Sequence, residues 1–354
     1  MAALGEGLRA VGADPEVVLR APEHPFEYPA DRVLRPLPAL MYGLSAPLRR
    51  DVLHFQYGST WVRHHLDARL AGFLHRTRVV TFHGDDCRLG EVAKELFPAR
   101  GRVKSNAGDD ATRARLAALA RLCDAAVVND FELATYVSPY FPRVYLLPVP
   151  VGGPTPPERR PRDPNRPPVI VHAPSDPVAK GTAAVEAAVE TVAAHLPLEF
   201  RLLRGVPHRR VLAELEDADV VVDQLNSVAT GIFALESMRV GLPVCGEFDR
   251  SVLAPFQADV PVVAVTAETL ADELEALLLD PARRTALGQE GREFVERVHA
   301  ANRVAAAALQ VYAHAREAPP GLYVAEPRGI RAVEAALVER QGLVGSARAP
   351  RMTS

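Results

Sequence analysis

ADVVVDQLNSVATGIFALESMRVGLPVC, residues 218 to 245, carries the clearest signal of the fold of this chain. Its valine run, Val220–Asp223, predicts a strand, because a continuous apolar run of this length is typical of a parallel strand that helices cover on both faces. A loop ending at Thr230-Gly231 leads into a short helix, which Gly241-Leu242-Pro243 stops before the next strand. The stretch therefore predicts one strand–helix unit of an α/β sheet.

The helix of this unit is apolar on nearly all sides, yet it carries Glu236 at its centre. A carboxylate in such a place costs free energy unless a partner satisfies it. A helix that starts at a glycine after a strand is also a natural seat for an anion such as a diphosphate. Glu236 could then accept from ribose hydroxyls, or it could reach water or pair with Arg239 on a simple packing helix. Spacing alone leaves both readings open.

The same stretch resembles the nucleotide-binding segment of retaining glycosyltransferases with two Rossmann-like domains (GT-B type), in the large group called family 4. There a Gly-φ-x-x-x-Glu-(Ala/Ser)-Met-x-x-Gly-x-Pro-Val pattern, φ being apolar, holds the donor. The positions that match are Gly231, Ile232, Glu236, Ser237, Met238, Gly241, Pro243 and Val244. The family usually has a second Glu eight residues before the first, where this chain has Val228. The resemblance implies that Gly231, Ile232, Phe233 and Glu236 bind a nucleotide-sugar donor.

The length of 354 residues suits two domains, and strands alternate with helices throughout, which favours parallel sheets wound on both faces. We expect a Rossmann-like acceptor domain at 1–150, a proline-rich linker at 151–168, a Rossmann-like nucleotide-sugar-binding domain at 169–298, a crossover helix at 299–317 and an extension at 318–354 with a frayed end.

The first residues depart from this scheme. A Rossmann-like domain opens with a strand and a glycine-rich turn. Here Leu4, Leu8 and Val11 have helical spacing, Gly12 closes the helix, and the first predicted strand is Glu16–Leu19. We expect the N-terminal domain to lack its first strand, either because the chain starts one element late or because its sheet is reduced.

Lys180-Gly181 is the second candidate donor contact. It lies in HAPSDPVAKGT, residues 172 to 182, where a strand end leads to a helix start. An ammonium group beside free helix N–H groups suits a phosphate, although a surface lysine near a cap would have the same sequence. The segment resembles the family's Arg-x(4–5)-Lys-Gly phosphate clamp, but Pro174 or Ser175 replaces the arginine, which leaves Arg204 as a further candidate.

Two histidines complete the candidates. His208 follows Gly205 in a loop whose family counterpart lines the base pocket, and it could equally be an ordinary first-turn residue. His83 ends a predicted strand, where sheets of this kind present ligand-binding residues. A lone histidine is more often structural, but TFHGDD resembles the family motif whose histidine reaches the donor sugar. We therefore predict His83 as catalytic, with Asp86 or Asp85 orienting the acceptor hydroxyl.

Composition narrows the functional classes. The net charge of −3 gives no basic field for nucleic acid, and three scattered cysteines give no disulfide framework. No apolar run is long enough to span a bilayer, which leaves peripheral membrane contact open. No Asp-x-Asp spacing or other ligand pattern predicts a metal site. We expect a cytoplasmic protein that needs no metal or other cofactor.

The predicted function is metal-independent, retaining transfer of a hexose-type sugar from a nucleotide-sugar donor to an unidentified acceptor. One alternative is a nucleotide-sugar 2-epimerase on the same fold. The other is a degenerate relative that binds nucleotides or acts as a scaffold, which Val228, the missing clamp arginine and the missing strand favour.

Overall fold

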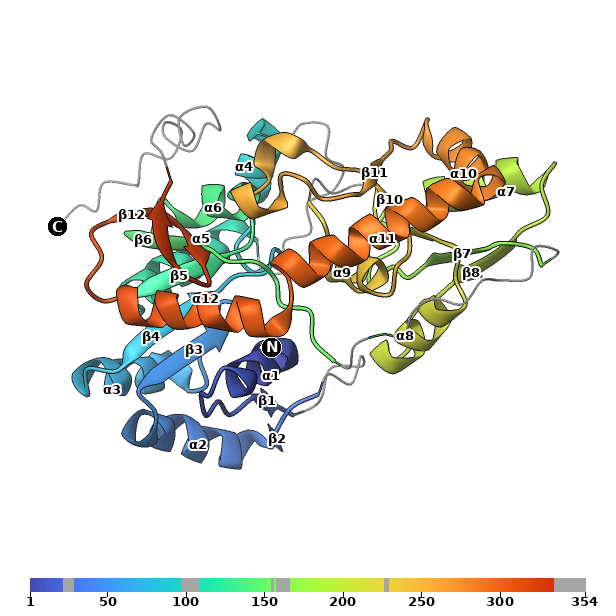
Figure 1. The fold of residues 1–354 in the computed structure, drawn as a ribbon. Helices are drawn as coiled ribbons and strands as arrows, with labels where there is room; N and C mark the ends of the chain where they lie inside the picture. Colours follow the sequence, from blue (N-terminus) through green and yellow to red (C-terminus); the bar gives the residue numbers. More distant parts are fainter. Residues whose placement is uncertain (22–28, 97–107, 154–155, 157–165, 226–228, 334–354) are drawn as a thin grey trace.

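The computed structural model of the 354-residue chain describes residues 1–21, 29–96, 108–153, 156, 166–225 and 229–333. The chain forms two α/β domains, each built on its own sheet (Figure 1). The two-domain α/β prediction is confirmed. Most of the linker expected at 151–168, Val228 and the last residues of the chain lie outside the described residues.

The C-terminal domain has a five-stranded parallel sheet in the order β11-β10-β9-β7-β8. Its strands are β7 (Val169–His172), β8 (Glu199–Leu202), β9 (Val220–Val222), β10 (Val244–Gly246) and β11 (Val263–Ala264). The strand order reverses at β7: the chain passes first to β8 on one side and then returns to β9 on the other. Loops after β7 and β9 therefore leave the sheet in different directions. We call the region between them the crevice, because sheets of this kind bind ligands at such a reversal.

Helices cover both faces of this sheet, as the valine runs predict. On one face Val169, Val171 and Val221 pack against helices α8 (His208–Glu216), α9 (Ile232–Arg239) and α11 (Pro281–Val298). On the other face Ile170 and Val220 pack against α7 (Thr182–Ala193) and α10 (Leu270–Leu279).

The N-terminal domain has a six-stranded sheet in the order β13-β12-β6-β5-β4-β3. Four strands come from the first half of the chain: β3 (Val52–Gln56), β4 (Thr77–Thr81), β5 (Ala125–Val128) and β6 (Arg143–Leu146). These four are parallel and follow one another in sequence order without a reversal. The helices of this part of the chain are α2 (Pro36–Arg49), α3 (Leu66–Phe73), α4 (Gly90–Leu96), α5 (Asp109–Ala120) and α6 (Phe131–Val137).

The early strand expected from sequence does form, but outside the large sheet. β1 (Val18–Arg20) pairs in parallel with β2 (Arg32–Leu34) in a separate two-stranded sheet. Among the described residues, no strand pairs with the outer edge of β3, so the large sheet begins there.

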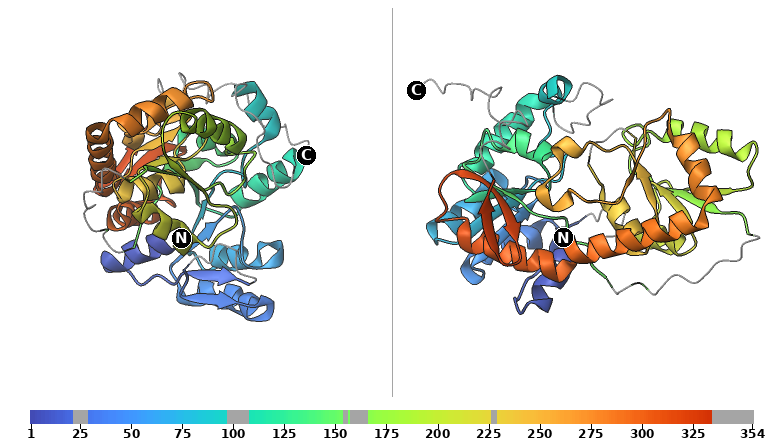
Figure 2. Two further views of the ribbon diagram at one scale, coloured as in Figure 1. Left: turned by 90° about the vertical axis from the view of Figure 1, so that its right-hand side faces the viewer. Right: turned by 45° about the horizontal axis from the view of Figure 1, so that its top comes forward.

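The C-terminal part of the chain returns to the N-terminal domain. Helix α12 (Ala301–His314) follows α11 along one side of the molecule (Figure 2) and buries Val304 and Val311 against Val79 and Val127 of the N-terminal sheet. The first helix, α1 (Ala2–Ala10), lies against α12 so closely that a Cβ at Gly7 would meet the carbonyl of Ala301.

The residues beyond 318 also belong to the N-terminal domain. β12 (Gly321–Glu326) pairs in parallel with β6, and β13 (Gly329–Ala332) pairs with β12 in antiparallel fashion. Where it is described, the expected C-terminal extension is therefore part of the N-terminal sheet. Its frayed end lies outside the described residues.

Candidate functional site

The loops after β7 and β9 meet at the point where the strand order of the C-terminal sheet reverses. Lys180 Nζ donates to Asp223 Oδ1 at 3.0 Å and also to Gln224 Oε1. The other oxygen of Asp223 accepts from the Gly231 N–H at 3.2 Å. The Lys180 side chain keeps 19% of its surface exposed, whereas that of Asp223 keeps 4%. An ammonium and a carboxylate thus lie at the N-terminal end of α9.

Gly231 is the residue that lets these groups come together. It is the N-cap of α9 and has no side chain to cap the helix. A Cβ built on it would lie 3.0 Å from Asp223 Oδ2 and 3.3 Å from Lys180 Nζ, which is tighter than ordinary contact. The small residue therefore keeps the helix N-terminus open, where unsatisfied N–H groups favour an anion.

The lysine loop is held by local bonds. Asp176 Oδ1 accepts from the N–H groups of Val178 and Ala179, and Gly181 takes the left-handed conformation, with φ of 68°, that glycine tolerates best. This turn places Lys180 at the crevice, two residues before α7 begins. Gly181 thus has a backbone role at the predicted position.

His172, at the end of β7, is a site residue that the sequence analysis did not single out. It is fully buried, and its ring nitrogens contact Val222 O at 2.8 Å and Thr182 Oγ1 at 3.0 Å. Burial lowers the pKa of His172, which favours a neutral ring. The ring joins the end of β7 to β9 and to the start of α7. The signal available in the sequence was its place at the end of a buried strand, beside the Lys180 loop.

Glu236 and His208 form a second contact across the crevice. Glu236 Oε1 lies 2.8 Å from His208 Nε2, and the bond to this carboxylate raises the pKa of His208. Their side chains are 15% and 30% exposed, so both can still be reached from solvent. Arg239, the alternative partner considered for Glu236, donates to the carbonyl of Gly152 at 2.6 Å.

The two residues after Gly231 differ in which of their atoms a ligand could contact. Ile232 is 46% exposed, and its side chain is therefore available beside the helix N-terminus. Phe233 is 8% exposed and belongs to the core beneath α9, so any contact with a ligand would have to come from its backbone. Arg204 is half-exposed and pairs with Glu186 at 3.3 Å.

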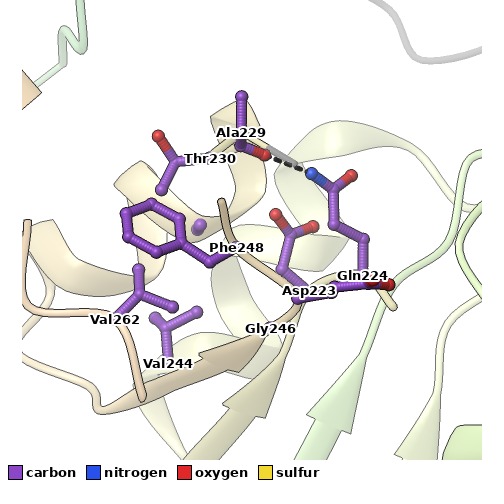
Figure 3. Close-up of a pocket in the computed structure, with 10 residues that line it drawn as sticks. Asp223, Gln224, Ala229, Thr230, Val244, Gly246, Phe248 and Val262 are labelled. Carbon is purple, nitrogen blue, oxygen red and sulfur yellow. Dashed lines mark hydrogen bonds between the residues drawn. The ribbon is translucent and has the colours of Figure 1, made fainter. Parts of the chain in front are cut away.

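A pocket lies next to the Asp223 carboxylate, at the carboxyl ends of β9 and β10 (Figure 3). Asp223 and Gln224 form its polar side, and Phe248 and Val262 form an apolar wall. Gln224 also donates to Ala229 O, and both residues line the pocket. The pocket therefore continues the lysine site as a small, partly apolar recess.

His83 lies at the corresponding edge of the N-terminal sheet, directly after β4. Its Nε2 is 2.8 Å from Gln56 Oε1, and its ring packs on Tyr57 with centroids 4.4 Å apart. Asp86 Oδ1 accepts from the N–H groups of His83 and Gly84 at 2.9 and 2.8 Å. Burial raises the pKa of Asp86, and these N–H groups oppose the rise. Asp86 thus holds the turn, and His83 is exposed at its tip.

A buried ion pair supports this turn. Arg88 donates to both carboxylate oxygens of Glu132 at 2.9 Å, and the Glu132 side chain is fully buried. Arg88 also reaches Asp85 Oδ1 at 3.4 Å, which gives that carboxylate a partner within the turn. The sequence offered no signal for the pair with Glu132, because its partners lie 44 residues apart in no recognised motif.

Within the described ranges, no group of three or more His, Cys, Asp or Glu residues is placed to hold a metal ion.

No protein-family model matches the sequence, and no curated protein matches it. Solved structures do. The sucrose-phosphate synthase of Thermosynechococcus elongatus is 17% identical, with 88% of this chain and 91% of that chain covered and a TM-score of 0.57. An alpha-glucosyltransferase in complex with UDP and DNA is 10% identical, with 84% and 90% covered and a TM-score of 0.55. WaaG, a glycosyltransferase involved in lipopolysaccharide biosynthesis, is 14% identical, with 83% and 90% covered and a TM-score of 0.50.

The chain has the GT-B fold. Within this GT-B fold, the predicted donor residues Lys180, Gly181, His208, Gly231 and Glu236 gather at one edge of the C-terminal sheet through the contacts described above. His83 and Asp86 lie together at the carboxyl end of β4 in the other domain.

Proposed function

We propose that this GT-B protein is a retaining glycosyltransferase that uses a nucleotide-sugar donor. The observation that carries the proposal is the meeting of Lys180 with the open N-terminus of α9 at the reversal of the C-terminal sheet, with Glu236 one turn farther along the helix. Positive charge followed by a hydrogen-bond acceptor matches a diphosphate followed by a ribose.

The donor would enter as a competitor of Asp223. In the structure the carboxylate of Asp223 accepts hydrogen bonds from both Lys180 and the Gly231 N–H. A diphosphate would take over these donors, together with first-turn N–H groups of α9. Glu236 would accept from ribose hydroxyls, with His208 holding the carboxylate in place.

The transfer step would break the bond between the anomeric carbon of the sugar and the leaving phosphate oxygen, and would form a bond from the same carbon to the acceptor oxygen. The acceptor proton would pass to the leaving diphosphate. Lys180 and the α9 N-terminus would stabilise the charge that develops there, and His83 would hold the sugar. We propose that these groups suffice without a metal ion.

A reaction screen tests the proposal. The chain is incubated with UDP-, GDP- and ADP-hexoses and a mixture of glycan, lipid and small-molecule acceptors, with and without magnesium. Release of one nucleoside diphosphate, with a product that keeps the anomeric configuration of the donor by NMR, supports it. A 2-epimer formed from UDP-N-acetylglucosamine without acceptor would indicate an epimerase, and donor binding without turnover would indicate a degenerate relative.

We also propose a cytoplasmic location, the compartment in which free thiols persist. All three cysteines are free and buried.

A further inference from the structure

Helix α2 presents small residues to the protein and large apolar residues to solvent. Its buried positions are Ala39, Gly43, Ala46 and Pro47. The outward residues fall on one stripe at helical spacing, and their exposed fractions are 68% for Leu37, 40% for Leu40, 65% for Met41, 38% for Leu44 and 62% for Leu48. An apolar stripe normally faces the core, so this one is positioned to meet something outside the domain.

The inner face of α2 is packed too closely for the helix to rotate its stripe inward. A Cβ on Gly43 would lie 2.7 Å from Val62 Cγ2 and 2.9 Å from Trp61 Cβ. Asp67, which is fully buried, accepts from the Trp61 N–H and fixes the segment beneath the helix. The outward direction of the large side chains is therefore built into the fold.

The neighbouring helix α3 carries two more exposed apolar side chains. It packs beside α2 at the outer edge of the N-terminal domain (Figure 1), with Leu66 49% exposed and Phe73 81% exposed. We call the exposed side chains of these two helices the α2–α3 face.

The two segments that form this face carry mainly positive charge. Residues 35–50 and 59–76 contain six arginines and one acidic residue, the buried Asp67, in a chain whose net charge is −3. Arg50 and Arg76 have carboxylate partners from other segments. In the described part of the chain no ion pair is found for the other four, all of them exposed: Arg35, Arg49, Arg63 and Arg69.

We propose that the α2–α3 face docks on an anionic lipid bilayer. Its stripe can enter the acyl boundary while the arginines meet lipid phosphates, which is how an interfacial amphipathic helix binds. A second copy of the chain fits less well, because a two-fold interface would bring two copies of the same positively charged face together. Docking would be peripheral, since no helix among the described residues is long and apolar enough to cross a membrane.

Vesicle sedimentation tests the proposal. The full chain is mixed with vesicles of phosphatidylcholine alone or with phosphatidylglycerol, at low and high salt. Binding should require the anionic lipid and weaken with salt. Met41→Ser/Leu48→Ser should reduce binding about tenfold or more, because two exposed apolar side chains are lost. Arg35→Gln/Arg63→Gln should reduce binding by a similar factor, since each positive charge near the anionic membrane surface contributes to the affinity.

A matched control shows whether binding depends on the α2–α3 face or on any exposed apolar side chain. Leu279 on α10 is 63% exposed, like Leu48, but lies in the C-terminal domain. Leu279→Ser should bind vesicles as the wild type does, and all variants should keep the wild-type melting temperature. Wild-type protein that stays in the supernatant with anionic vesicles at low salt would overturn the proposal. A dimer in solution that Met41→Ser/Leu48→Ser abolishes would also overturn it, by assigning the face to a second copy. This test does not depend on donor chemistry.

Discussion

The two sheet edges that carry the candidate residues are built differently. In the C-terminal domain, side chains join separate loops across the crevice: Lys180 reaches Asp223, and His208 reaches Glu236. In the N-terminal domain, Asp86 holds the turn after β4 from within, and the buried Arg88–Glu132 pair supports it. The neighbours of His83 are Gln56 at the end of β3 and Tyr57 just after it.

The difference follows from topology. The C-terminal sheet reverses its strand order at β7, so two loops diverge and leave a polar crevice between them. The strands β3 to β6 follow one another without a reversal, and their loops form one continuous edge. We infer that the C-terminal edge is preorganised for binding, whereas the N-terminal edge presents His83 to a ligand bound opposite.

Breaking the Lys180–Asp223 pair should give the largest change in stability. Lys180→Met leaves a carboxylate that is 4% exposed without its ammonium. We expect a loss of about 2–4 kcal/mol in the free energy of unfolding, at or below the range for breaking a buried pair, because Lys180 remains partly exposed. Urea denaturation measures it.

The double variant Lys180→Met/Asp223→Asn is the control for this loss. An amide in place of the carboxylate removes the unpaired charge, so most of the lost stability should return while the diphosphate site stays without its cation. A double variant as unstable as the single one would mean that Lys180 acts through packing and not through its charge.

His83→Ala tests the N-terminal sheet edge in the same way. Removing one group that stabilises the reaction centre costs roughly 100-fold in turnover. Nucleotide affinity should stay within about threefold, because the proposed contacts with the nucleotide all lie in the C-terminal domain and His83 would meet only the sugar. Steady-state rates and nucleotide titrations of the same preparation measure both quantities. Equal losses in rate and affinity would indicate a misfolded turn.

Glu236→Gln should give the smallest effect on stability, and one that depends on pH. The bond to Glu236 raises the pKa of His208 above its ordinary value of 6.5. The contact therefore contributes its full stabilisation below the pKa that His208 has in the unfolded chain. This contribution is lost as the pH rises through the higher pKa of His208 in the folded protein. Melting temperatures of wild type and variant should differ more at about pH 6 than at about pH 9. An equal difference at both values would remove His208 as the cause.

The sequence predicted the C-terminal domain better than the N-terminal one. The strand, the glycine and the helix with Glu236 are contiguous, so local patterns were enough to place them in one α/β unit. The contact between Glu236 and His208 was not predicted, because His208 comes from a different loop and only the folded sheet brings the two together.

Long-range pairing limits what could be predicted in the N-terminal domain. β12 joins β6 across more than 170 residues of chain, and no local pattern signals such a partner. Glu16–Leu19 was expected as a strand, and the strand that forms pairs with β2 and not with the large sheet. The outward stripe of α2 was also missed, because periodicity shows that a helix has an apolar face but not which way it points.

Calorimetric titration of the intact chain with UDP, GDP and ADP, with and without magnesium, tests the central claim most directly. We expect one nucleotide to bind equally well in both conditions, and Lys180→Met/Asp223→Asn, although folded, not to bind it. Unchanged binding by that variant, or no binding of any nucleotide by the folded wild type, would contradict the assignment of the donor site.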